Sequence, residues 1–265
     1  MPEKLKVWPL SGALAYGYGV FTTLRISRGK PFLYGEHWRR LEAHAERINL
    51  ALRWTESEVL ESLTQLIAAN CVKEGRARIN LLQVENLYWH KLGRGLGCDL
   101  LIFTAPLAEE CQDVRMTISS YKVSSSSPLA GVKSLNYLQP MLTLQHAKAC
   151  GYDEAVVLNE NAEIVSAALA NIFWIGNETL YTPALSVGCL AGITRELVLK
   201  LACSLKIEVV EAAFRMEHLL AAEEVFISSS VRGLTRVALI GHQRYEHRSQ
   251  IYTQLLKSFH EIEIG

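Results

Sequence analysis

The sequence predicts an α+β fold made of two domains, and three observations support this prediction. A chain of 265 residues with 49% apolar side chains is long enough for one large domain or two of ordinary size, with a substantial core. Strand-like and helix-like segments follow one another without a regular β–α–β alternation, which argues for an α+β or complex α/β fold rather than a doubly wound sheet. A polar, proline-containing segment divides the chain into halves. We therefore expect a small N-terminal α+β domain over 1–106, a linker over 107–113 and a larger C-terminal domain over 114–265.

Local patterns predict the elements of the first half. The first strand is rich in β-branched and aromatic side chains, which favour extended backbone. Apolar residues that recur every three or four positions indicate an amphipathic helix after it. Thr55 and Glu58 have the spacing of a capping box, which opens a second helix. In order, we expect a strand over 16–26, helices over 36–50 and 55–72, and strands over 77–84 and 99–104.

The same signals continue in the second half, where a run of serines forms the clearest loop. Apolar runs of strand length alternate irregularly with stretches of helical spacing. In order, we expect a strand over 114–123, a loop over 124–127, a helix over 137–149, strands over 154–158 and 171–175, a helix over 193–205, strands over 208–212 and 223–228, and a helix over 246–260.

Charge and cysteine content narrow the functional classes. Lysine plus arginine and aspartate plus glutamate both number 27, so net charge favours neither nucleic acid nor an anionic membrane. We find no signal-peptide pattern and no apolar run near the ~20 residues that span a bilayer. The six cysteines are scattered without metal-ligand spacing. We expect a cytoplasmic protein that acts on a small molecule and holds no metal.

One lysine, Lys133, lies in an almost uncharged stretch between the serine-rich loop and a helix. Apolar surroundings lower the pKa of a lysine because desolvation disfavours the ammonium form. The resulting neutral amine can attack a carbonyl and form a Schiff base. A lysine at a loop edge whose ammonium reaches water is the simpler interpretation of this segment taken alone.

Three further features carry groups that bind anions. A glycine-bearing turn over 188–192 precedes a helix, whose free N–H groups would form a phosphate seat together with the Thr194 hydroxyl. Three serines over 228–230 end an apolar strand and supply more donors. Arg40 lies beside the apolar stripe of its helix, where a guanidinium could reach a buried phosphate. The plain alternatives are a capped helix start, a polar turn and a solvated arginine.

The first strand places Phe21, Thr23 and Arg25 on one face, because strand side chains alternate. A ring, a hydroxyl and a guanidinium on one face suit a cavity for an anionic substrate. The alternative is a strand at a domain rim with Arg25 in a salt bridge.

Together these segments resemble the fold-type IV pyridoxal-phosphate family, which contains branched-chain and D-amino-acid aminotransferases and aminodeoxychorismate lyases. The resemblance covers about 16–50 and 128–237, and FTT-x-R and LAG-x-K-x-LN look most like the lyases. Six pieces occur in family order: YGYGVFTTLR, EHWRRLEAHAERI, LAGVKSLNYL, GYDEAVVLNENAEIVSAALANIFWI, LYTPALSVGCLAGITRE and AAEEVFISSS.

The resemblance implies a C-terminal domain with a barrel-like sheet, pyridoxal 5′-phosphate bound between the two domains, and a homodimer. Its residue roles carry over by matched position. Lys133 would bind the cofactor covalently; Arg40, the Ile193 and Thr194 amides and Ser230 would hold the phosphate; Tyr137 and Asn171 would lie close to the cofactor; and Tyr16, Phe21, Thr23 and Arg25 would face the substrate.

Two departures from the family pattern affect the chemistry. The family has a glutamate five residues before Asn171 that keeps the pyridine nitrogen protonated, and this chain has Ser166 there. A neutral hydroxyl cannot supply that charge, so we expect weak carbanion stabilisation, which hurts transamination more than an elimination that ends in an aromatic ring. Glu163 is a poor replacement by strand parity. The family's arginine–glycine stretch is also replaced over 85–95, where Arg94 is one candidate for binding substrate carboxylates.

We therefore expect a 4-amino-4-deoxychorismate lyase of folate biosynthesis, with Lys133 as its catalytic amine and Thr23 as a proton relay. An amino-acid aminotransferase of the same fold is the alternative. Ser166 also admits a cofactor-binding protein with weak catalysis, and the plainest alternative is an α+β protein whose Lys133 is structural.

Overall fold

The computed structural model describes residues 11–84, 96–107, 113–246 and 249–264. The chain forms two compact units: Met1–Leu107 with Val132–Tyr137, and Ala108–Gly131 with Leu138–Gly265. The mixture of helices and strands confirms the predicted α+β class. None of the helices in the described ranges is long and apolar enough to cross a membrane.

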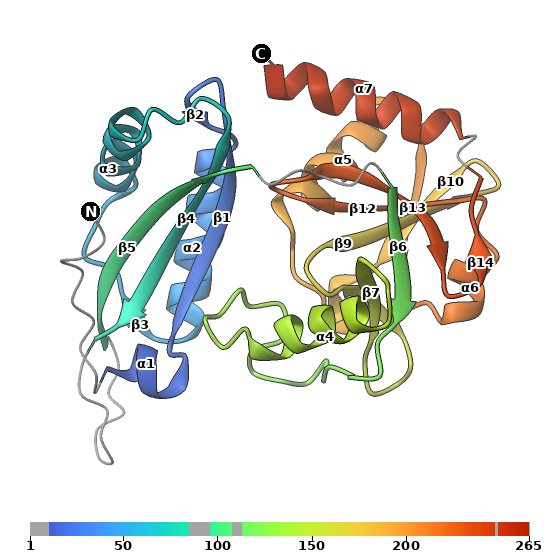
Figure 1. Cartoon of the computed structure of the whole chain (residues 1–265), viewed down its shortest axis with the longest axis horizontal. Coiled ribbons are helices and arrows are strands. Elements are labelled where there is room, and N and C mark those ends of the chain that lie inside the picture. Colours follow the sequence, from blue (N-terminus) through green and yellow to red (C-terminus); the bar gives the residue numbers. More distant parts are fainter. Residues whose placement is uncertain (1–10, 85–95, 108–112, 247–248, 265) are drawn as a thin grey trace. The chain divides into compact units, whose positions relative to one another are not determined.

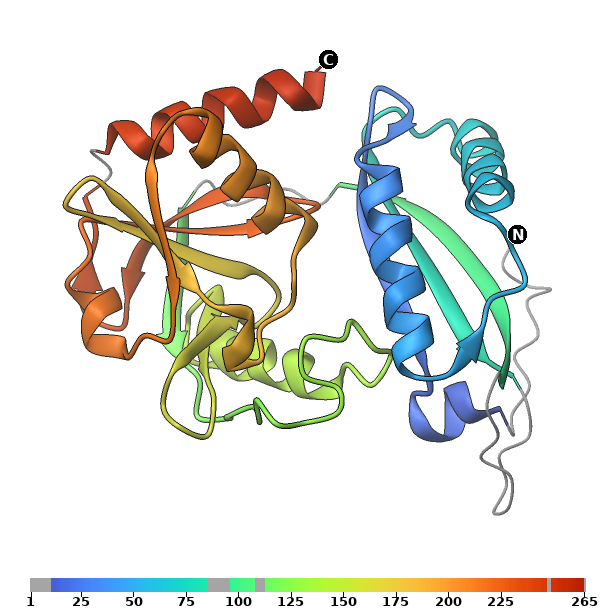
Figure 2. The same ribbon diagram turned by 180° about the vertical axis from the view of Figure 1, so that it is seen from behind.

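The first unit is a five-stranded sheet with helices on one face (Figure 2). Its elements are α1 (Gly12–Tyr16), β1 (Gly19–Ser27), β2 (Lys30–Pro31), α2 (Tyr34–Arg47), β3 (Leu50–Ala51), α3 (Glu56–Ala69), β4 (Gly75–Gln83) and β5 (Leu96–Pro106). The strand order is β2–β1–β4–β5–β3, and all pairs are antiparallel except β3 with β5. The capping box predicted at Thr55 and Glu58 is present at the start of α3.

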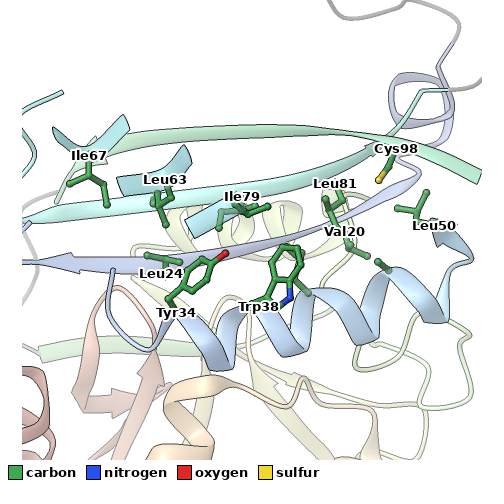
Figure 3. Close-up of a cluster of buried hydrophobic side chains, with 14 of the residues drawn as sticks. Val20, Leu24, Tyr34, Trp38, Leu50, Leu63, Ile67, Ile79, Leu81 and Cys98 are labelled. Carbon is green, nitrogen blue, oxygen red and sulfur yellow. The ribbon is translucent and has the colours of Figure 1, made fainter. Parts of the chain in front are cut away.

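The core of the first unit lies between this sheet and helices α2 and α3 (Figure 3). Val20 and Leu24 of β1 face inwards together with Ile79 and Leu81 of β4, and Trp38 of α2 packs against them. Each such buried side chain stabilises the fold by about 1.5–3 kcal/mol. Because strand side chains alternate, the same pattern leaves Phe21 and its neighbours at alternate positions on the other face of β1.

The second unit is built on one long, strongly curled sheet (Figure 1). Its elements are β6 (Asp113–Ile118), α4 (Leu138–Ala149), β7 (Glu154–Leu158), β8 (Ile164–Ala167), β9 (Asn171–Gly176), β10 (Thr179–Pro183), the 3₁₀ helix η2 (Leu185–Val187), α5 (Ile193–Ser204), β11 (Glu208–Ala212), α6 (Met216–Leu220), β12 (Glu224–Ser229), β13 (Gly233–Ile240), β14 (Gln243–Arg244) and α7 (Gln250–Ile264). The strand order is β11–β10–β9–β12–β13–β6–β7–β8, with β14 paired to β13.

Three predicted element bounds are corrected by local hydrogen bonds. Tyr16 ends helix α1 rather than starting a strand, because Ser11 caps that helix and Gly17 ends it at a φ of 64°. Strand β6 stops at Ile118 because the Ser119 hydroxyl bonds to the backbone of Tyr121 and turns the chain. The terminal helix begins at Gln250 because Ser249 accepts the Ile251 N–H. The strands β2, β3, β8, β10, β13 and β14 and the helices η2 and α6 were not predicted.

The predicted domain bounds differ from the two units in one segment. Residues 132–137 were expected in the C-terminal domain, but Ser134 forms a β-bridge with Val20 and places this segment in the first unit. Of the predicted linker 107–113, residues 108–112 lie outside the described ranges and Asp113 already belongs to β6.

Candidate functional site

The segment that carries Lys133 is held by backbone hydrogen bonds to β1. The Phe21 N–H donates to the Lys133 carbonyl at 2.9 Å, and the Leu135 N–H donates to the Gly19 carbonyl at 2.8 Å. The Lys133 N–H in turn donates to Nδ1 of His44 on α2 at 3.2 Å. A strand and a helix therefore fix the backbone of Lys133 from two sides.

The Lys133 amine lies among aromatic groups. Its Nζ is 3.4 Å from the Tyr137 hydroxyl, 4.6 Å from the centre of the Phe21 ring and 4.9 Å from the centre of the Tyr137 ring. The two rings meet edge to face, with centroids 5.0 Å apart. The lysine keeps only part of its surface exposed. The predicted apolar setting of this lysine is thus present in the structure.

Two arginines add positive charge around this amine. The Arg78 guanidinium lies over the Phe21 ring at 3.6 Å from its centre, and its Nε donates to Oδ1 of Asn80 at 2.9 Å. Burial, followed by the charges of Arg40 and Arg78, lowers the pKa of Lys133 to about 7. A large fraction of the amine is therefore neutral near pH 7, the form that attacks carbonyls.

Arg40 and two histidines on α2 complete this group. Arg40 Nη2 donates to the Thr22 hydroxyl at 3.1 Å, and burial lowers the pKa of Arg40 to about 10, so it stays charged at neutral pH. Burial also lowers the pKa of His37 well below its ordinary value and that of His44 to about 4, helped for both by Arg40 and Lys133. The charges acting on these groups are cationic, so the surroundings favour a bound anion.

In the second unit, helix α5 (Ile193–Ser204) begins without a side-chain cap. Gly192 is the N-cap of the 12-residue helix α5 and has no side chain to cap it. The backbone N–H groups of Ile193 and Thr194 therefore point out of the N-terminal end of the helix. A Cβ on Gly192 would overlap Oδ1 of Asn171, whose Nδ2 donates to the Leu190 carbonyl at 2.9 Å. This close approach requires glycine and keeps the helix start open.

Two predicted serines lie in the same unit. Ser166 pairs with Val157 across β7 and β8, and its hydroxyl makes no hydrogen bond with the described part of the chain. Ser230 directly follows β12. Glu163, weighed as a replacement acid, accepts a hydrogen bond from Asn159 Nδ2 at 2.7 Å, so its carboxylate is already engaged.

The structure groups some of the predicted substrate residues and separates others. Phe21 lies beside Lys133 and Tyr137, while Thr23 and Arg25 lie farther along β1, where Arg25 Nη2 is 3.9 Å from Glu74. Tyr16, at the end of α1, is 59% exposed, and within the described residues its side chain makes no hydrogen bond or ring contact with Phe21, Lys133 or Tyr137. Arg94 lies outside the described residues.

Sequence reasoning missed Thr22, His37, His44 and Arg78. Arg78 pairs with Thr23 across β1 and β4, and no local pattern fixes that register. The two histidines did carry a signal, because His37, Arg40 and His44 recur at helical spacing and so share one side of α2.

Comparisons with known proteins show which family this chain is similar to. The aminotransferase class IV family matches residues 19–240. Aminodeoxychorismate lyase of Bacillus subtilis is 26% identical over 264 residues, covering 97% of this chain and 89% of that protein. Branched-chain-amino-acid aminotransferase of Escherichia coli K12 is 30% identical over 247 residues, covering 89% and 80%.

Solved structures are similar over almost the whole chain. A Legionella pneumophila protein provisionally assigned as a 4-amino-4-deoxychorismate lyase has a TM-score of 0.93 at 25% identity, covering 99% of this chain and 98% of its own. The branched-chain aminotransferase of Thermoproteus uzoniensis has a TM-score of 0.93 at 28% identity, covering 99% and 91%. The chain therefore belongs to the aminotransferase class IV family, the fold-type IV enzymes that depend on pyridoxal 5′-phosphate.

Proposed function

We propose that this protein is a 4-amino-4-deoxychorismate lyase, which removes pyruvate from its substrate and leaves 4-aminobenzoate. Ser166 is the observation that favours a lyase over an aminotransferase. Strand β8 carries no acidic residue, and Glu163 before it is hydrogen-bonded to Asn159. An elimination that ends in an aromatic ring tolerates weak carbanion stabilisation better than repeated proton shifts do.

The residues present fit pyridoxal 5′-phosphate. The Lys133 amine, with its pKa lowered to about 7, suits an aldehyde. The cationic surroundings of Arg40 and the open N–H groups at the start of α5 suit a phosphate. By their match to the family, the proposed phosphate ligands are Arg40, Ile193, Thr194 and Ser230, and the proposed neighbours of the ring are Tyr137, Ser166 and Asn171.

The proposed chemistry gives this chain's residues separate tasks. When bound, the cofactor supplies an aldehyde that bonds to amines and a ring that withdraws electrons. Lys133 would hold the cofactor through its amine and, when that amine is free, would take the proton from the carbon that bears the substrate nitrogen. The bond from the neighbouring carbon to the enolpyruvyl oxygen breaks. That group then receives a proton from Lys133, or through Thr23, and leaves as pyruvate.

Arg78 is the residue that we add to the substrate-binding set of Tyr16, Phe21, Thr23 and Arg25. Asn80 and the Phe21 ring hold its guanidinium on the side of β1 where Lys133 Nζ lies. A fixed guanidinium binds a carboxylate through two parallel hydrogen bonds, and the proposed substrate carries carboxylates. Arg78 therefore joins Arg25 and Arg94, the arginines that the sequence offered for binding an anionic substrate.

An amino-acid aminotransferase is the second candidate, and the comparisons favour it as much as the lyase. The Escherichia coli branched-chain enzyme is 30% identical to this chain, against 26% for the Bacillus subtilis lyase. A cofactor-binding protein with weak catalysis is the third candidate, and Ser166 is the observation behind it. We also propose that the protein is cytoplasmic and forms a homodimer. Sedimentation in solution would test the dimer.

The deciding experiment follows one spectrum and one product. The purified protein is reconstituted with pyridoxal phosphate and dialysed, and its visible absorbance is recorded before and after addition of aminodeoxychorismate while 4-aminobenzoate is quantified. Lys133→Ala removes the proposed amine. Lys148→Ala, which changes an exposed lysine on α4, is the matched control.

The lyase predicts a visible band and aromatic product in the wild-type and Lys148→Ala proteins, and neither in Lys133→Ala. Loss of the band on addition of an amino acid alone, with a keto acid formed, would indicate an aminotransferase. A band without either product would indicate a binding protein. The absence of any band would mean that Lys133 has only a structural role.

A further inference from the structure

A small polar cluster lies inside the apolar interface between β1 and α2. Thr22 is 0% exposed and His37 is 1% exposed, and their neighbours Val20, Leu24 and Leu41 are fully buried apolar residues. Burying a hydroxyl and an imidazole costs free energy unless both are hydrogen-bonded. An apolar pair would fill this interface at lower cost, so the cluster calls for an explanation other than packing.

Thr22 connects His37 to Arg40. Its Oγ1 lies 2.6 Å from Nδ1 of His37 and accepts a hydrogen bond from Nη2 of Arg40 at 3.1 Å. A guanidinium can only donate, so the hydroxyl proton of Thr22 is available for Nδ1. The three groups then form one chain in which Arg40 donates to Thr22 and Thr22 donates to His37, and each hydrogen bond strengthens the next.

This chain works only with an uncharged histidine. Burial and the nearby charges of Arg40 and Lys133 keep His37 neutral at physiological pH. A neutral imidazole whose Nδ1 accepts leaves the positive charge of the cluster on Arg40. An imidazolium would instead donate to Thr22 and compete with Arg40 for its oxygen.

We propose that Thr22 and His37 are positioning residues that fix the guanidinium of Arg40 for an anionic phosphate. The inference rests on the proposed function, because it takes that phosphate to be the one of the cofactor. Arg40 has several rotatable bonds, and a fixed guanidinium loses less freedom when it binds. The cluster therefore acts on phosphate affinity, while Lys133 supplies the covalent bond.

The test compares pyridoxal 5′-phosphate with pyridoxal, which has the same aldehyde but no phosphate. Apparent dissociation constants are measured by visible absorbance for the wild-type protein, Thr22→Val and His37→Leu. Thr22→Ser keeps the hydroxyl, and His37→Asn keeps an acceptor near Nδ1. Ile26→Val, on the same buried face of β1 but farther along the strand, controls for a general loss of stability.

Loss of the Thr22 hydrogen bond to the charged Arg40 predicts about tenfold weaker binding of pyridoxal 5′-phosphate in Thr22→Val. His37→Leu removes the acceptor that orients the Thr22 hydroxyl, so it should weaken binding in the same direction. Pyridoxal affinity should not change, and Thr22→Ser and His37→Asn should bind like the wild type. Equal weakening of both ligands, or no change in either, would overturn the positioning role while leaving the proposed function intact. A wild-type protein that binds neither ligand would overturn the proposed function and this inference with it.

Discussion

Replacing Arg78 by glutamine should raise the pKa of Lys133. Burial and the charges of Arg40 and Arg78 together lower this pKa from 10.5 to about 7. Glutamine keeps part of the side-chain stem over the Phe21 ring but removes one of the two charges. The amine should then hold its proton to higher pH and react more slowly with aldehydes at pH 7.

The size of this effect follows from the geometry around Phe21. The Arg78 guanidinium carbon and Lys133 Nζ lie 3.6 Å and 4.6 Å from the same ring centre, so they are at most about 8 Å apart. At that separation Coulomb's law gives about 0.5 kcal/mol in water and about 2 kcal/mol at an effective dielectric constant of ~20. These energies correspond to a rise of roughly 0.4 to 1.5 pKa units.

The assay follows the modification of Lys133 in the cofactor-free protein by a small amine-reactive reagent, with the labelled peptide quantified by mass spectrometry across pH. The wild-type rate should rise through pH 7 and then level off, because only the neutral amine reacts. The curve for Arg78→Gln should lie at higher pH.

Arg76→Gln is the matched control for this assay. Arg76 lies two residues earlier on β4 and is exposed, and it is not among the charges that lower the pKa of Lys133. Coincident curves for wild type and Arg78→Gln would refute the electrostatic explanation. A shift of the same size in Arg76→Gln would attribute the effect to general surface charge.

Three further predictions concern the second unit. Glu154 is 0% exposed, and burial raises its pKa from 4.5 to about 7, so the native state binds an extra proton between these pH values and its stability falls as pH rises through them. In urea titrations above pH 7, Glu154→Gln should therefore be more stable than wild type by up to ~3 kcal/mol, and a difference that stays constant across pH would contradict this. Gly192→Ala should displace Asn171, lower the free energy of unfolding by about 1–3 kcal/mol and weaken cofactor binding. Calorimetry and absorbance titration measure these two quantities, and no change in either would show that the helix start tolerates a Cβ. If the missing acid limits transamination, an amino acid should convert the cofactor about tenfold faster in Ser166→Glu than in Ser166→Ala, which corresponds to a barrier lower by ~1.4 kcal/mol. Stopped-flow absorbance measures both rates, and equal rates would show that an acid at position 166 does not limit transamination.

Local signals predicted the elements whose bounds depend on neighbouring residues. The capping box at Thr55 and Glu58 fixed the start of α3, and strands β7 and β11 match their predicted ranges. Tyr16 was misplaced because a five-residue helix with caps at both ends leaves almost no periodic signal. Strand β8, with four residues, is likewise too short for its alternation to be read.

Residues of the candidate site could be predicted only where their neighbours in the sequence already indicate their chemistry. Lys133 stood out because its segment is nearly uncharged. The pairing of Thr23 with Arg78, and of Val20 with Ser134, joins residues far apart in the sequence, and such registers depend on the whole sheet. The hydrogen bond between Thr22 and His37 depends in the same way on how α2 packs against β1. Whether the predicted residues hold the cofactor stays a prediction.

The segment Val132–Tyr137 belongs to the first unit although the chain before and after it belongs to the second. During synthesis, about 30 residues beyond Leu107 must therefore be translated before residues 132–137 can pair with β1. Lys133 is among the last residues to join the first unit, so an incomplete chain lacks the surroundings that lower the pKa of its amine. For the same reason a fragment that ends at Leu107 would lack Lys133, and no single cut of the polypeptide separates the two units intact. Adding a peptide of residues 132–137 to such a fragment would show whether the sheet can recruit its missing edge from solution.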